Sequence, residues 1–509
     1  MMRDNISRWN FGIAVLVTII ISLPYLLGFI FENDEVRFNG FLLNPIDGSS
    51  YLAKMEEGRQ GSWLFHFRYS PETVNGAPYY FLYIFLGHVA GLFNLDNILI
   101  FHIARILFSW LLLFILNKVV HVIFSAKPWL AVLTFAWLTI SGGMGWLLLG
   151  SGTLPGDLWV AEAYPFLSMF SNPHFPAGIS LLLSSFLIYS YRNSLISVIL
   201  LGFISLLLSI VFPFAVIIGI ASLGLLTFWN LVARRSNSWL NFVSFAIPGG
   251  LWSVGQQVIA LKDPYLSQWN AQNIAITGSF GAFLLSFSPG LILAVAAIFW
   301  IKPWRDSILI RLITCWLFVA VLIAFVPFSS QRRFLIGFQI PVILLASTLL
   351  DRLSSARNLS KISAIVAFVL TLPSVILIIA GSINGVMSKS DSLFMSRDTL
   401  SAIYWLGNHS EPEDVILASA INGRHIPAII NRRVVYGHPI ESIKAVERLR
   451  IIDEIFAGKG EGLVQIMTTL PIRYILIDKT EYVNLKELDA MQFSLVGDWN
   501  GVQIFESKR

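Results

Sequence analysis

The sequence predicts a polytopic α-helical membrane protein that ends in a small α/β domain, and three observations support this fold class. The chain of 509 residues is 56% hydrophobic and only 13% charged, whereas about a quarter of the residues in soluble domains are charged. Apolar runs long enough to cross a bilayer, which takes about 20 residues, recur between residues 11 and 383. Beyond residue 387 the pattern changes to short strand-like and helix-like segments typical of a soluble domain.

The membrane-spanning segments can be placed by their length and apolar composition. The first, at 11–31, lacks the small-residue cleavage site of a signal peptide and is expected to be a retained anchor. The continuous run at 194–233 is divided at Pro213, because one helix of that length would overshoot the bilayer and proline ends or kinks helices. About eleven spans are expected in all. The others lie at 97–123, 128–150, 177–191, 239–261, 278–301, 307–327, 334–350 and 361–383.

The distribution of lysine and arginine predicts the orientation of the chain. The apolar segment at 79–93 has only about 15 residues, so we expect a helix on the outer surface rather than a span. Basic clusters, such as Arg234 with Arg235 and Lys302 with Arg305, then face the cytoplasm, as the positive-inside rule requires. The prediction is a multi-pass plasma-membrane protein with a cytoplasmic N-terminus. Its polar outer loops are 32–80, 151–176 and 262–277.

Two domains follow from this arrangement. Residues 1–387 form the transmembrane domain, whose first outer loop with its juxtamembrane helices covers 32–96, and residues 388–509 form a soluble extracytoplasmic α/β domain. The segment Gly437-His438-Pro439 and the segment at 422–425 are typical of turn and capping chemistry rather than of ligands. In the soluble domain, strands are expected at 414–419, 432–437, 473–478 and in FSLVGDW and GVQIFES, and a helix at 441–457.

Several function classes are disfavoured by the composition. The single Cys315 lies in an apolar run, so neither an intramolecular disulfide nor a CxxC metal site is possible. The net charge of +5 comes without a basic stripe, and we expect no nucleic-acid partner. The soluble domain has no GxGxxG, P-loop or HExxH motif, so neither nucleotide binding nor proteolysis is indicated.

The first outer loop is the segment most indicative of function, because connections between helices are usually about 2 to 8 residues long and this one is far longer. Asp47 precedes a short amphipathic segment with Tyr51 and Met55 on one face, a position that suits an N-cap residue. It also suits a general base, because partial desolvation at a membrane surface can raise the pKa of a carboxylate toward neutrality. The carboxylates of this loop are Glu32, Asp34, Glu35, Asp47, Glu56, Glu57 and Glu72.

The order of short motifs in this chain resembles membrane glycosyltransferases of the GT-C fold. Asp47 with Tyr51 at i+4, a Gly-containing amphipathic segment, and Pro78-Tyr79-Tyr80 before an apolar helix carry the likeness. It extends to Arg105 at the start of the next span, to Asp157 in the second outer loop, and to QRRFLIGFQIP at 331–341. The resemblance is to the branch containing protein O-mannosyltransferases and lipid A aminoarabinose transferases, and it covers roughly residues 1–345. Each motif is short and degenerate, and their order on one face of the membrane makes the case.

The resemblance implies a polyprenyl-phosphate sugar as donor, with Asp47 as the catalytic base and Arg332 and Arg333 as phosphate ligands. Two arginines beside a membrane surface are also a good bidentate anchor for phosphate on physical grounds, although they fit an interfacial anchor or a salt bridge to the soluble domain equally well. Tyr51, Tyr79 and Arg105, which carry the likeness, are expected to contact substrate. The family commonly has a lysine just before its Pro-Tyr motif, where this chain has Asn75-Gly76-Ala77, and Arg68 is a candidate substitute. Asp34 and Glu35 are rivals of Asp47 for the role of base.

The second outer loop offers Asp157, Glu162 and His174 as further substrate contacts among several aromatic residues. Carboxylates accept hydrogen bonds from sugar hydroxyls, and aromatic faces pack on sugar rings. Trp159 and Tyr164 also fit an ordinary interfacial aromatic belt. The same acids and His174 could join Asp47 around a divalent cation, but ligands without a fixed spacing are a weak signal, and no metal or other cofactor is predicted.

The function expected from the sequence is transfer of a sugar from a polyprenyl-phosphate donor to a glycan, lipid or protein acceptor at the outer face of the membrane. A transporter or flippase of a lipid-linked solute is an alternative, and it would place ionisable residues in mid-span. The spans are almost free of them, since Arg311 and Arg105 lie near helix ends. A non-catalytic assembly or sensor protein with an extracytoplasmic C-terminal domain is a third interpretation. The soluble domain either selects the acceptor or acts as a scaffold.

Overall fold

The computed structural model describes residues 2–191, 194–235, 239–353 and 357–508. The chain divides into two compact units. The first unit comprises residues 1–24, 102–255 and 274–384, and the second comprises residues 25–101, 256–273 and 385–509. The second unit therefore joins the first outer loop predicted at 32–96 with the C-terminal residues predicted to form a soluble domain.

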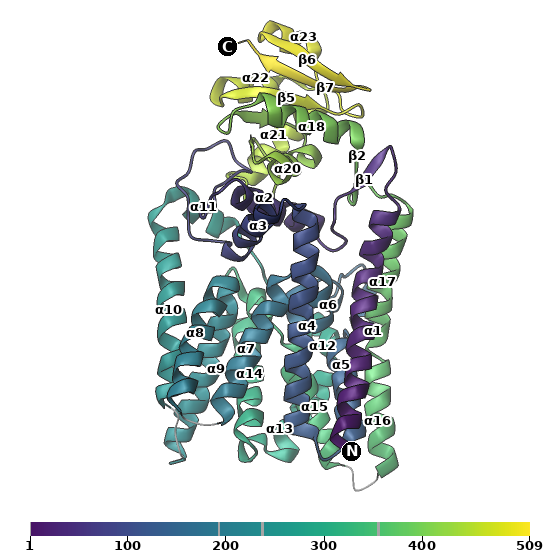
Figure 1. Ribbon diagram of the computed structural model, residues 1–509, viewed down its shortest axis with the longest axis vertical. Helices are drawn as coiled ribbons and strands as arrows, with labels where there is room; N and C mark the ends of the chain where they lie inside the picture. The colour runs from purple at the N-terminus through teal and green to yellow at the C-terminus, as the bar shows by residue number, and fades with distance from the viewer. Residues whose placement is uncertain (1, 192–193, 236–238, 354–356, 509) are drawn as a thin grey trace. The chain divides into compact units, whose positions relative to one another are not determined.

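Helices make up the first unit. Apolar side chains line the contacts of α7 (His174–Tyr191), α8 (Leu195–Val211), α9 (Pro213–Val232) and α14 (Ile308–Phe325), which pack side by side (Figure 1). α15 (Gln339–Arg352) is buried along nearly its whole length and packs on α13 (Gly290–Ile301). The remaining helices are α1 (Met2–Ile30), α4 (Asn97–Phe124), α5 (Pro128–Thr139), α6 (Pro165–Ser171), α10 (Trp239–Lys262), α12 (Phe280–Phe287), α16 (Arg357–Val369) and α17 (Leu372–Met387). Short 3₁₀ helices are η1 (Gly145–Ser151), η2 (Gly156–Leu158), η3 (Ala161–Ala163), η4 (Pro303–Arg305) and η5 (Gln331–Leu335).

The helical membrane class is confirmed, whereas the predicted number of about eleven spans is not. By length and apolar composition, five helices within the described residues could cross a membrane, and a sixth if the bent pair α12 and α13 counts as one span. The five are Ile6–Ile30, Asn97–Phe124, Pro213–Val232, Ile308–Phe325 and Ser360–Met387. The predicted division at Pro213 is found, since α8 ends at Val211 and α9 begins at Pro213.

Two of the predicted spans differ from the observed helices. In the segment at 128–150 the α-helix ends at Thr139, and after a non-helical stretch the 3₁₀ helix η1 begins at Gly145. The segment at 278–301 consists of two helices bent by 87°. Pro289 stands at this break, where it cannot donate the backbone hydrogen bond that would continue the helix. Apolar composition alone does not reveal either interruption.

A five-stranded sheet forms the centre of the second unit. Its order is β4-β3-β5-β7-β6, in which β3 pairs in parallel with β4 and β5, and β7 pairs antiparallel with β5 and β6. The strands are β3 (Val415–Leu417), β4 (Arg433–Val434), β5 (Ile472–Ile477), β6 (Phe493–Trp499) and β7 (Val502–Ser507). β3, β4, β6 and β7 lie within predicted strands or match them, whereas β5 begins and ends one residue before the predicted segment 473–478. The predicted helix at 441–457 corresponds to α21 (Ala445–Phe456), which begins four residues later, after a turn at 441–444.

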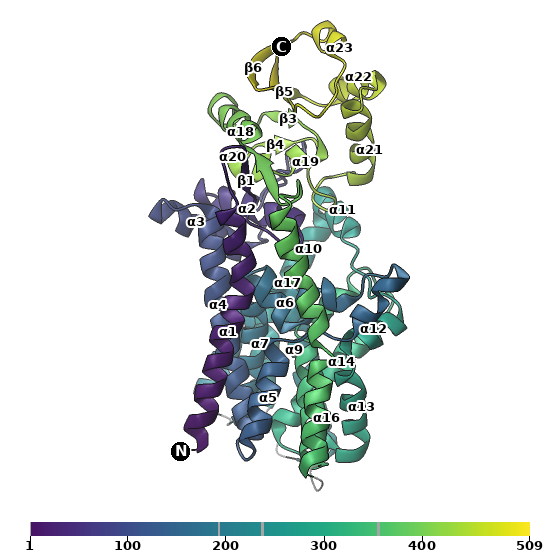
Figure 2. The same cartoon turned by 90° about the vertical axis from the view of Figure 1, so that its right-hand side faces the viewer.

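Side-chain alternation along the strands builds two apolar layers. Figure 2 shows the helices that cover the sheet, with α18 and α20 on one side and α21 and α22 on the other. One layer joins Ile475 and Ile477 of β5 to α21 and α22 (Gly460–Thr469). The other joins Tyr474 and Leu476 to α18 (Arg397–His409) and α20 (Ile426–Ile430), and it also takes in Ala53 of the first outer loop. This loop is therefore part of the core around the sheet. The remaining short helices of this part are α19 (Ala420–Gly423) and α23 (Leu485–Ala490).

The first outer loop forms two helices, α2 (Pro45–Arg59) and α3 (Phe81–Phe93), and the strand β1 (Val36–Phe38). A side chain at Gly58 would lie 2.0 Å from the Ile84 carbonyl oxygen, and one at Gly87 would lie 1.9 Å from that of Met55, so both glycines permit the close contact of α2 with α3. β1 pairs antiparallel with β2 (Phe394–Ser396), a pairing the sequence does not predict. α11 (Pro264–Gln272) belongs to the same unit.

Candidate functional site

Asp47 lies in the first turn of α2, in the segment that the sequence singles out. It is not the N-cap residue, because Pro45 begins the helix and Asn44 precedes it as N-cap, with a left-handed backbone at φ 50°. Asn44 makes no side-chain bond to the backbone of the helix, and its amide donates instead to Oδ2 of Asp47 at 2.5 Å. The capping interpretation of Asp47 is therefore wrong, and its carboxylate serves another contact.

That contact comes from the C-terminal part of the second unit. Nε2 of His438 lies 3.2 Å from Oδ1 of Asp47. The His438 side chain is only 4% exposed, whereas the Asp47 side chain is 39% exposed. Each oxygen of the Asp47 carboxylate thus has a side-chain partner, and the carboxylate still reaches solvent. A carboxylate held in this way can meet an incoming substrate without first leaving a buried position.

A buried charge network lies further along the same face of α2. The ammonium of Lys54 is 2.5 Å from Oε2 of Glu441, and the Ser50 hydroxyl donates to Oε1 of Glu441 at 2.6 Å. Both charged side chains are at most 3% exposed, and the Lys54 ammonium also lies 4.6 Å from the centre of the Tyr80 ring. Burial by itself would raise the pKa of Glu441, but the Lys54 ammonium and the hydrogen bond from Ser50 lower it below its ordinary value. Both members of this pair are missed by the sequence analysis.

The other predicted contacts in the first outer loop have defined partners in the second unit. The ring of Tyr51 stacks on Tyr83 of α3, with centroids 4.2 Å apart. The Tyr79 hydroxyl donates to the Gln256 carbonyl at 2.7 Å, and burial raises the pKa of Tyr79 to about 12, so it remains a neutral donor. Arg68 pairs with Glu57 at 3.2 Å. Their predicted roles in substrate binding stay predictions.

The rival acids stand on an exposed turn before β1. Asp34 and Glu35 are both exposed, and the side-chain oxygen of Asn33 accepts hydrogen bonds from the backbone N–H groups of Glu35 and Val36. The backbone carbonyl of Glu35 accepts a hydrogen bond from the backbone N–H of Arg397. This turn is thus tied through its backbone, whereas Asp47 is held by its carboxylate.

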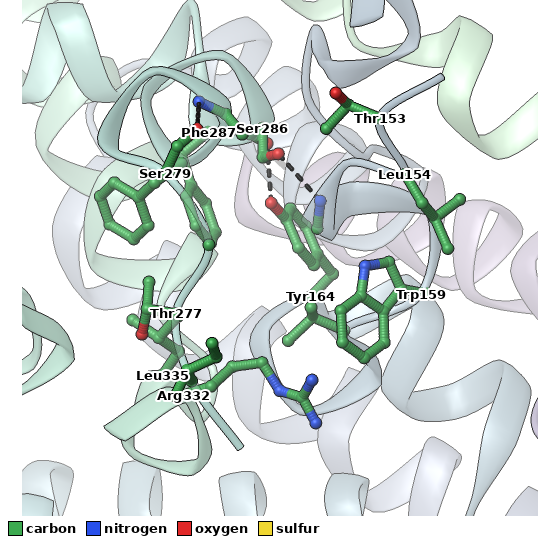
Figure 3. A pocket seen from close by; sticks show the side chains of 16 residues that line it. Thr153, Leu154, Trp159, Tyr164, Thr277, Ser279, Ser286, Phe287, Arg332 and Leu335 are labelled. Atoms are coloured by element: carbon green, nitrogen blue, oxygen red, sulfur yellow. Dashed lines mark hydrogen bonds between the residues drawn. The ribbon is translucent and has the colours of Figure 1, made fainter. Parts of the chain in front are cut away.

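A cavity of about 120 Å³ lies within the first unit, between the second outer loop and the segments around α12 and η5. Arg332 of η5 lines it, and its guanidinium carbon is 4.2 Å from the centre of the Trp159 ring (Figure 3). Nε of Arg332 is 3.5 Å from Oε1 of Glu162. Apolar side chains form most of the remaining wall, namely Leu154, Val160, Ile276, Ala282, Phe283, Phe287 and Leu335. One cation beside an apolar wall suits an amphipathic anion.

The predicted residues Glu162 and Arg332 are therefore brought together, whereas Asp157 has a different environment. Oδ2 of Asp157 accepts hydrogen bonds from the backbone N–H groups of Gly143 and Gly145 at 3.0 and 3.1 Å, and from the Ser374 hydroxyl at 2.6 Å. The residue is 0% exposed. Burial raises the pKa of Asp157, and these hydrogen bonds offset the shift only in part. Its observed contacts hold the loop together, and its predicted contact with substrate stays a prediction.

Three further predicted residues do not belong to the lining of this cavity. Arg105 is 1% exposed and donates from Nη1 to the carbonyl oxygens of Ile21 and Met169, at 3.2 and 3.0 Å. His174 begins α7 with its ring 4.0 Å from that of Phe175. The Arg333 guanidinium lies 5.6 Å from the centre of the Phe214 ring. Of the two predicted phosphate ligands, only Arg332 is part of the cavity wall.

No group of three or more His, Cys, Asp or Glu side chains with the geometry of a metal site occurs within the ranges that the structure describes. Metal dependence stays untested. The sites that emerge are the carboxylate of Asp47 with its neighbours in the second unit and the Arg332 cavity in the first unit.

The protein belongs to the class of multi-pass helical membrane proteins, and it carries a polar, acid-bearing loop after its first helix. Comparison with solved structures identifies its fold. The apo oligosaccharyltransferase of Archaeoglobus fulgidus matches with a TM-score of 0.58 and 12% identity, over 92% of this chain and 69% of that chain. The same protein tethered to an acceptor peptide containing the NVT sequon matches with a TM-score of 0.56 and 13% identity over the same shares. The chain therefore has the GT-C fold, as the sequence predicts.

ArnT from Cupriavidus metallidurans in the apo state aligns with 96% of this chain and 97% of its own length, at 14% identity. Its TM-score of 0.48 is too low to support an argument. A scan against known protein families found no match, and a search of curated proteins found none either. The structural likeness at these identities establishes the fold alone.

Proposed function

We propose that this protein is a membrane glycosyltransferase that transfers a sugar from a polyprenyl-phosphate donor to an acceptor at the outer face of the membrane. The observation that carries the proposal is the carboxylate of Asp47, which is held at both oxygens and remains 39% exposed at the start of α2. The GT-C fold supports it, and so does the neighbouring oligosaccharyltransferase, whose structure holds an acceptor peptide. The acceptor here is a glycan, a lipid or a protein.

Asp47 acts as the general base in this proposal. An acceptor hydroxyl or amine attacks the anomeric carbon of the sugar, and its proton passes to the Asp47 carboxylate. The bond between the anomeric carbon and the phosphate oxygen breaks, and polyprenyl phosphate leaves with the bonding electrons. A positioned base contributes about 10²–10⁴ in rate in such reactions. Hydrogen bonds from Asn44 and His438 stabilise the ionised carboxylate, which is the form that accepts a proton.

The Arg332 cavity is the proposed binding site for the donor. A guanidinium pairs well with phosphate oxygens, and the apolar wall suits the first isoprene units of the lipid. Glu162 and Trp159 both contact the guanidinium before the phosphate arrives. As the bond to the sugar breaks, the departing phosphate gains charge that Arg332 neutralises. The proposal also keeps seven further residues as substrate contacts and assigns none of them a step in the reaction. They are Tyr51, Tyr79, Arg68, Arg105, Asp157, His174 and Arg333.

The orientation inferred from the positive-inside rule completes the proposal. The N-terminus faces the cytoplasm, and both the first outer loop and the C-terminal residues face outward. Chemistry at the outer face then needs no nucleotide sugar, because a lipid carrier delivers the activated sugar across the membrane.

The test is release of polyprenyl phosphate from labelled polyprenyl-phosphate sugars by the purified full-length protein, with a membrane extract as the source of acceptors. We expect turnover by the wild type and a loss of about 10²–10⁴ in Asp47→Asn, with folding intact. Asp34→Asn and Glu35→Gln are matched controls, because they remove exposed carboxylates from the same loop.

Each outcome decides a separate part of the proposal. If Asp47→Asn keeps the wild-type rate while Asp34→Asn or Glu35→Gln loses it, the class holds and the base is a different acid. Absence of turnover by the wild type with every donor of a broad panel would count against a glycosyltransferase and in favour of a transport or assembly role.

A further inference from the structure

His438 has a side chain whose contacts go beyond those of a turn residue. Its segment, Gly437-His438-Pro439, reaches α2 from the far end of the sequence and lies within the same compact unit. The ring is 4% exposed and contacts the Asp47 carboxylate through Nε2 at 3.2 Å. The proposed reaction assigns no chemical task to this histidine.

The hydrogen bonds of the ring determine its tautomer. Nδ1 of His438 lies 3.1 Å from the backbone nitrogen of Ile440 and 3.1 Å from that of Glu441, and both of these nitrogens are N–H donors. Nδ1 therefore accepts and carries no proton, which leaves the proton of the neutral imidazole on Nε2. Nε2–H then donates to Oδ1 of Asp47. The contact is a hydrogen bond from a neutral donor, and a doubly protonated ring does not fit these surroundings.

The backbone around His438 is fixed by several independent bonds. The Ser442 hydroxyl accepts from the backbone N–H groups of Gly437 and His438, each at 3.2 Å. The side-chain amide of Gln272 donates to the carbonyl oxygens of Ile440 and Ser442, each at 3.0 Å. A side chain added at Gly437 would lie 2.4 Å from the carbonyl oxygen of Gly423, so only glycine fits at that position.

The same turn is also fixed in register along α2. Glu441, three residues after His438, binds Ser50 and Lys54, while His438 binds Asp47. Positions 47, 50 and 54 follow the i, i+3, i+7 spacing of one helix face. The buried ion pair therefore anchors the turn two helical turns away from the exposed carboxylate. A shift of the turn along the helix would break both sets of contacts together.

We infer that His438 is a positioning residue that orients the Asp47 carboxylate for proton transfer. The inference rests on the proposed function of Asp47 as base. Nε2–H of His438 donates to Oδ1 and the Asn44 amide donates to Oδ2, so both oxygens are held and the carboxylate plane is fixed. His438 transfers no proton, because its Nδ1 remains bound to the backbone. Removal of an orienting partner typically costs about 10–100-fold in activity.

The test combines kinetics and spectroscopy on the full-length protein. His438→Ala removes the donor, and His438→Gln places an amide N–H near the position of Nε2. We expect His438→Ala to lower kcat by about 10–100-fold with little change in donor KM, and His438→Gln to recover much of that loss. His409→Ala, at an exposed histidine of α18, is the matched control.

A double-substitution cycle separates positioning from structural support. If His438 acts through Asp47, His438→Ala causes no further loss of residual turnover in the Asp47→Asn background. Equal losses in the two backgrounds, or a glutamine variant as poor as alanine, would overturn the positioning role. A loss that appears only in the amount of folded protein would do the same.

A nitrogen NMR spectrum of the protein labelled at histidine tests the contact without any substrate. The His438 signals are assigned by their absence in His438→Gln. We expect a neutral ring with its proton on Nε2, and a shift of the Nε2 signal in Asp47→Asn while Nδ1 stays unprotonated. An Nδ1–H tautomer, or an Nε2 signal indifferent to Asp47→Asn, would overturn the inference. If the NMR result is as expected but the wild type releases no polyprenyl phosphate, the contact stands and the proposed function is what fails.

Discussion

Two acids of predicted outer loops, Asp47 and Asp157, are held in opposite ways. Asp47 is held by side chains, one of them 391 residues distant in the sequence, and it remains partly exposed. Asp157 is fully buried and is held by the backbone N–H groups of Gly143 and Gly145, only 14 and 12 residues away, together with Ser374. The Asp47 carboxylate can therefore still contact a substrate. The Asp157 carboxylate is enclosed and holds its loop together, and we call it a structural lock.

The position of an acid in a polar loop therefore does not decide its role. Both residues are carboxylates in loops that the sequence predicts to face outward. What separates them is whether a carboxylate oxygen reaches solvent, since a general base must touch the group from which it takes a proton.

Of the substitutions considered, Lys54→Met is expected to have the largest effect on the network that holds Asp47, His438 and Glu441 together. It removes the cation and leaves the Glu441 carboxylate buried beside Ser50, and breaking a buried pair in this way typically costs about 3–5 kcal/mol. Methionine fits the aromatic surroundings of Phe65 and Tyr80, so the loss comes from charge rather than shape. Hydrogen exchange at the backbone amides of 437–445 should accelerate by about two to three orders of magnitude.

The matched control is Lys459→Met, which removes an exposed lysine of the same unit and should leave this exchange unchanged. The double variant Lys54→Met/Glu441→Gln should recover much of the protection, because it removes both buried charges. Unchanged exchange in Lys54→Met would mean that the ion pair does not hold the turn on α2. The anchor of His438 would then have to lie in the bonds of Ser442 and Gln272 alone.

Arg332→Ala tests whether the cavity of the first unit contributes to binding of the donor. The cavity contacts of Arg332 with Glu162 and Trp159 predict a donor KM raised by about 10–100-fold, since hydrogen bonds to charged groups are worth about 1.5–3 kcal/mol. Arg332→Lys should lie between the wild type and the alanine variant, because lysine keeps the charge without the planar fork. Arg333→Ala is the control and should have the smaller effect. Equal effects of the two alanine variants would show that the cavity does not select between them.

The sequence predicts the elements well where the pattern is local. The helices beginning at Pro213 and Asn97 and the strands of the sheet follow from hydrophobic periodicity and from proline. The GT-C fold follows from the order of short motifs, and the comparison confirms it. The break at Pro289 is less predictable, since prolines also occur inside straight spans and the flanking residues are equally apolar on both sides.

The partners in the candidate site are less predictable for a physical reason. Lys54 and Glu441 are 387 residues apart, and nothing local in either segment indicates a buried ion pair. The one available signal is the spacing of Asp47, Ser50 and Lys54 on a single face of α2, which indicates a common partner but not its identity. His438 is predicted as a turn residue, which describes its backbone and omits its side chain.

Acid should act in opposite directions on the two regions. The pKa of Glu441 lies below its ordinary value of 4.5 in the folded protein, so its stabilising contribution is complete above pH 4.5 and is lost as the pH falls through the lower folded value. Burial raises the pKa of Asp157 above its ordinary value of 3.8, so the folded protein binds that proton more readily than the unfolded chain does. The region around Asp157 therefore gains stability as the pH falls through the raised value. Hydrogen exchange near each acid, corrected for the intrinsic rate, measures both trends.

Glu441→Gln and Asp157→Asn isolate the two contributions, because each substitution removes one titration and keeps the size of the side chain. For each acid, the difference in exchange stability between wild type and variant is plotted against pH. The two differences should change with pH in opposite directions. Each total change should be smaller than the loss of stability caused by Lys54→Met. If both differences have the same sign, Glu441 and Asp157 are held alike, and the contrast between a network held by side chains and a carboxylate held by the backbone fails. Opposite signs would establish that the lock around Asp157 tolerates a proton, whereas the network that anchors His438 requires an ionised Glu441.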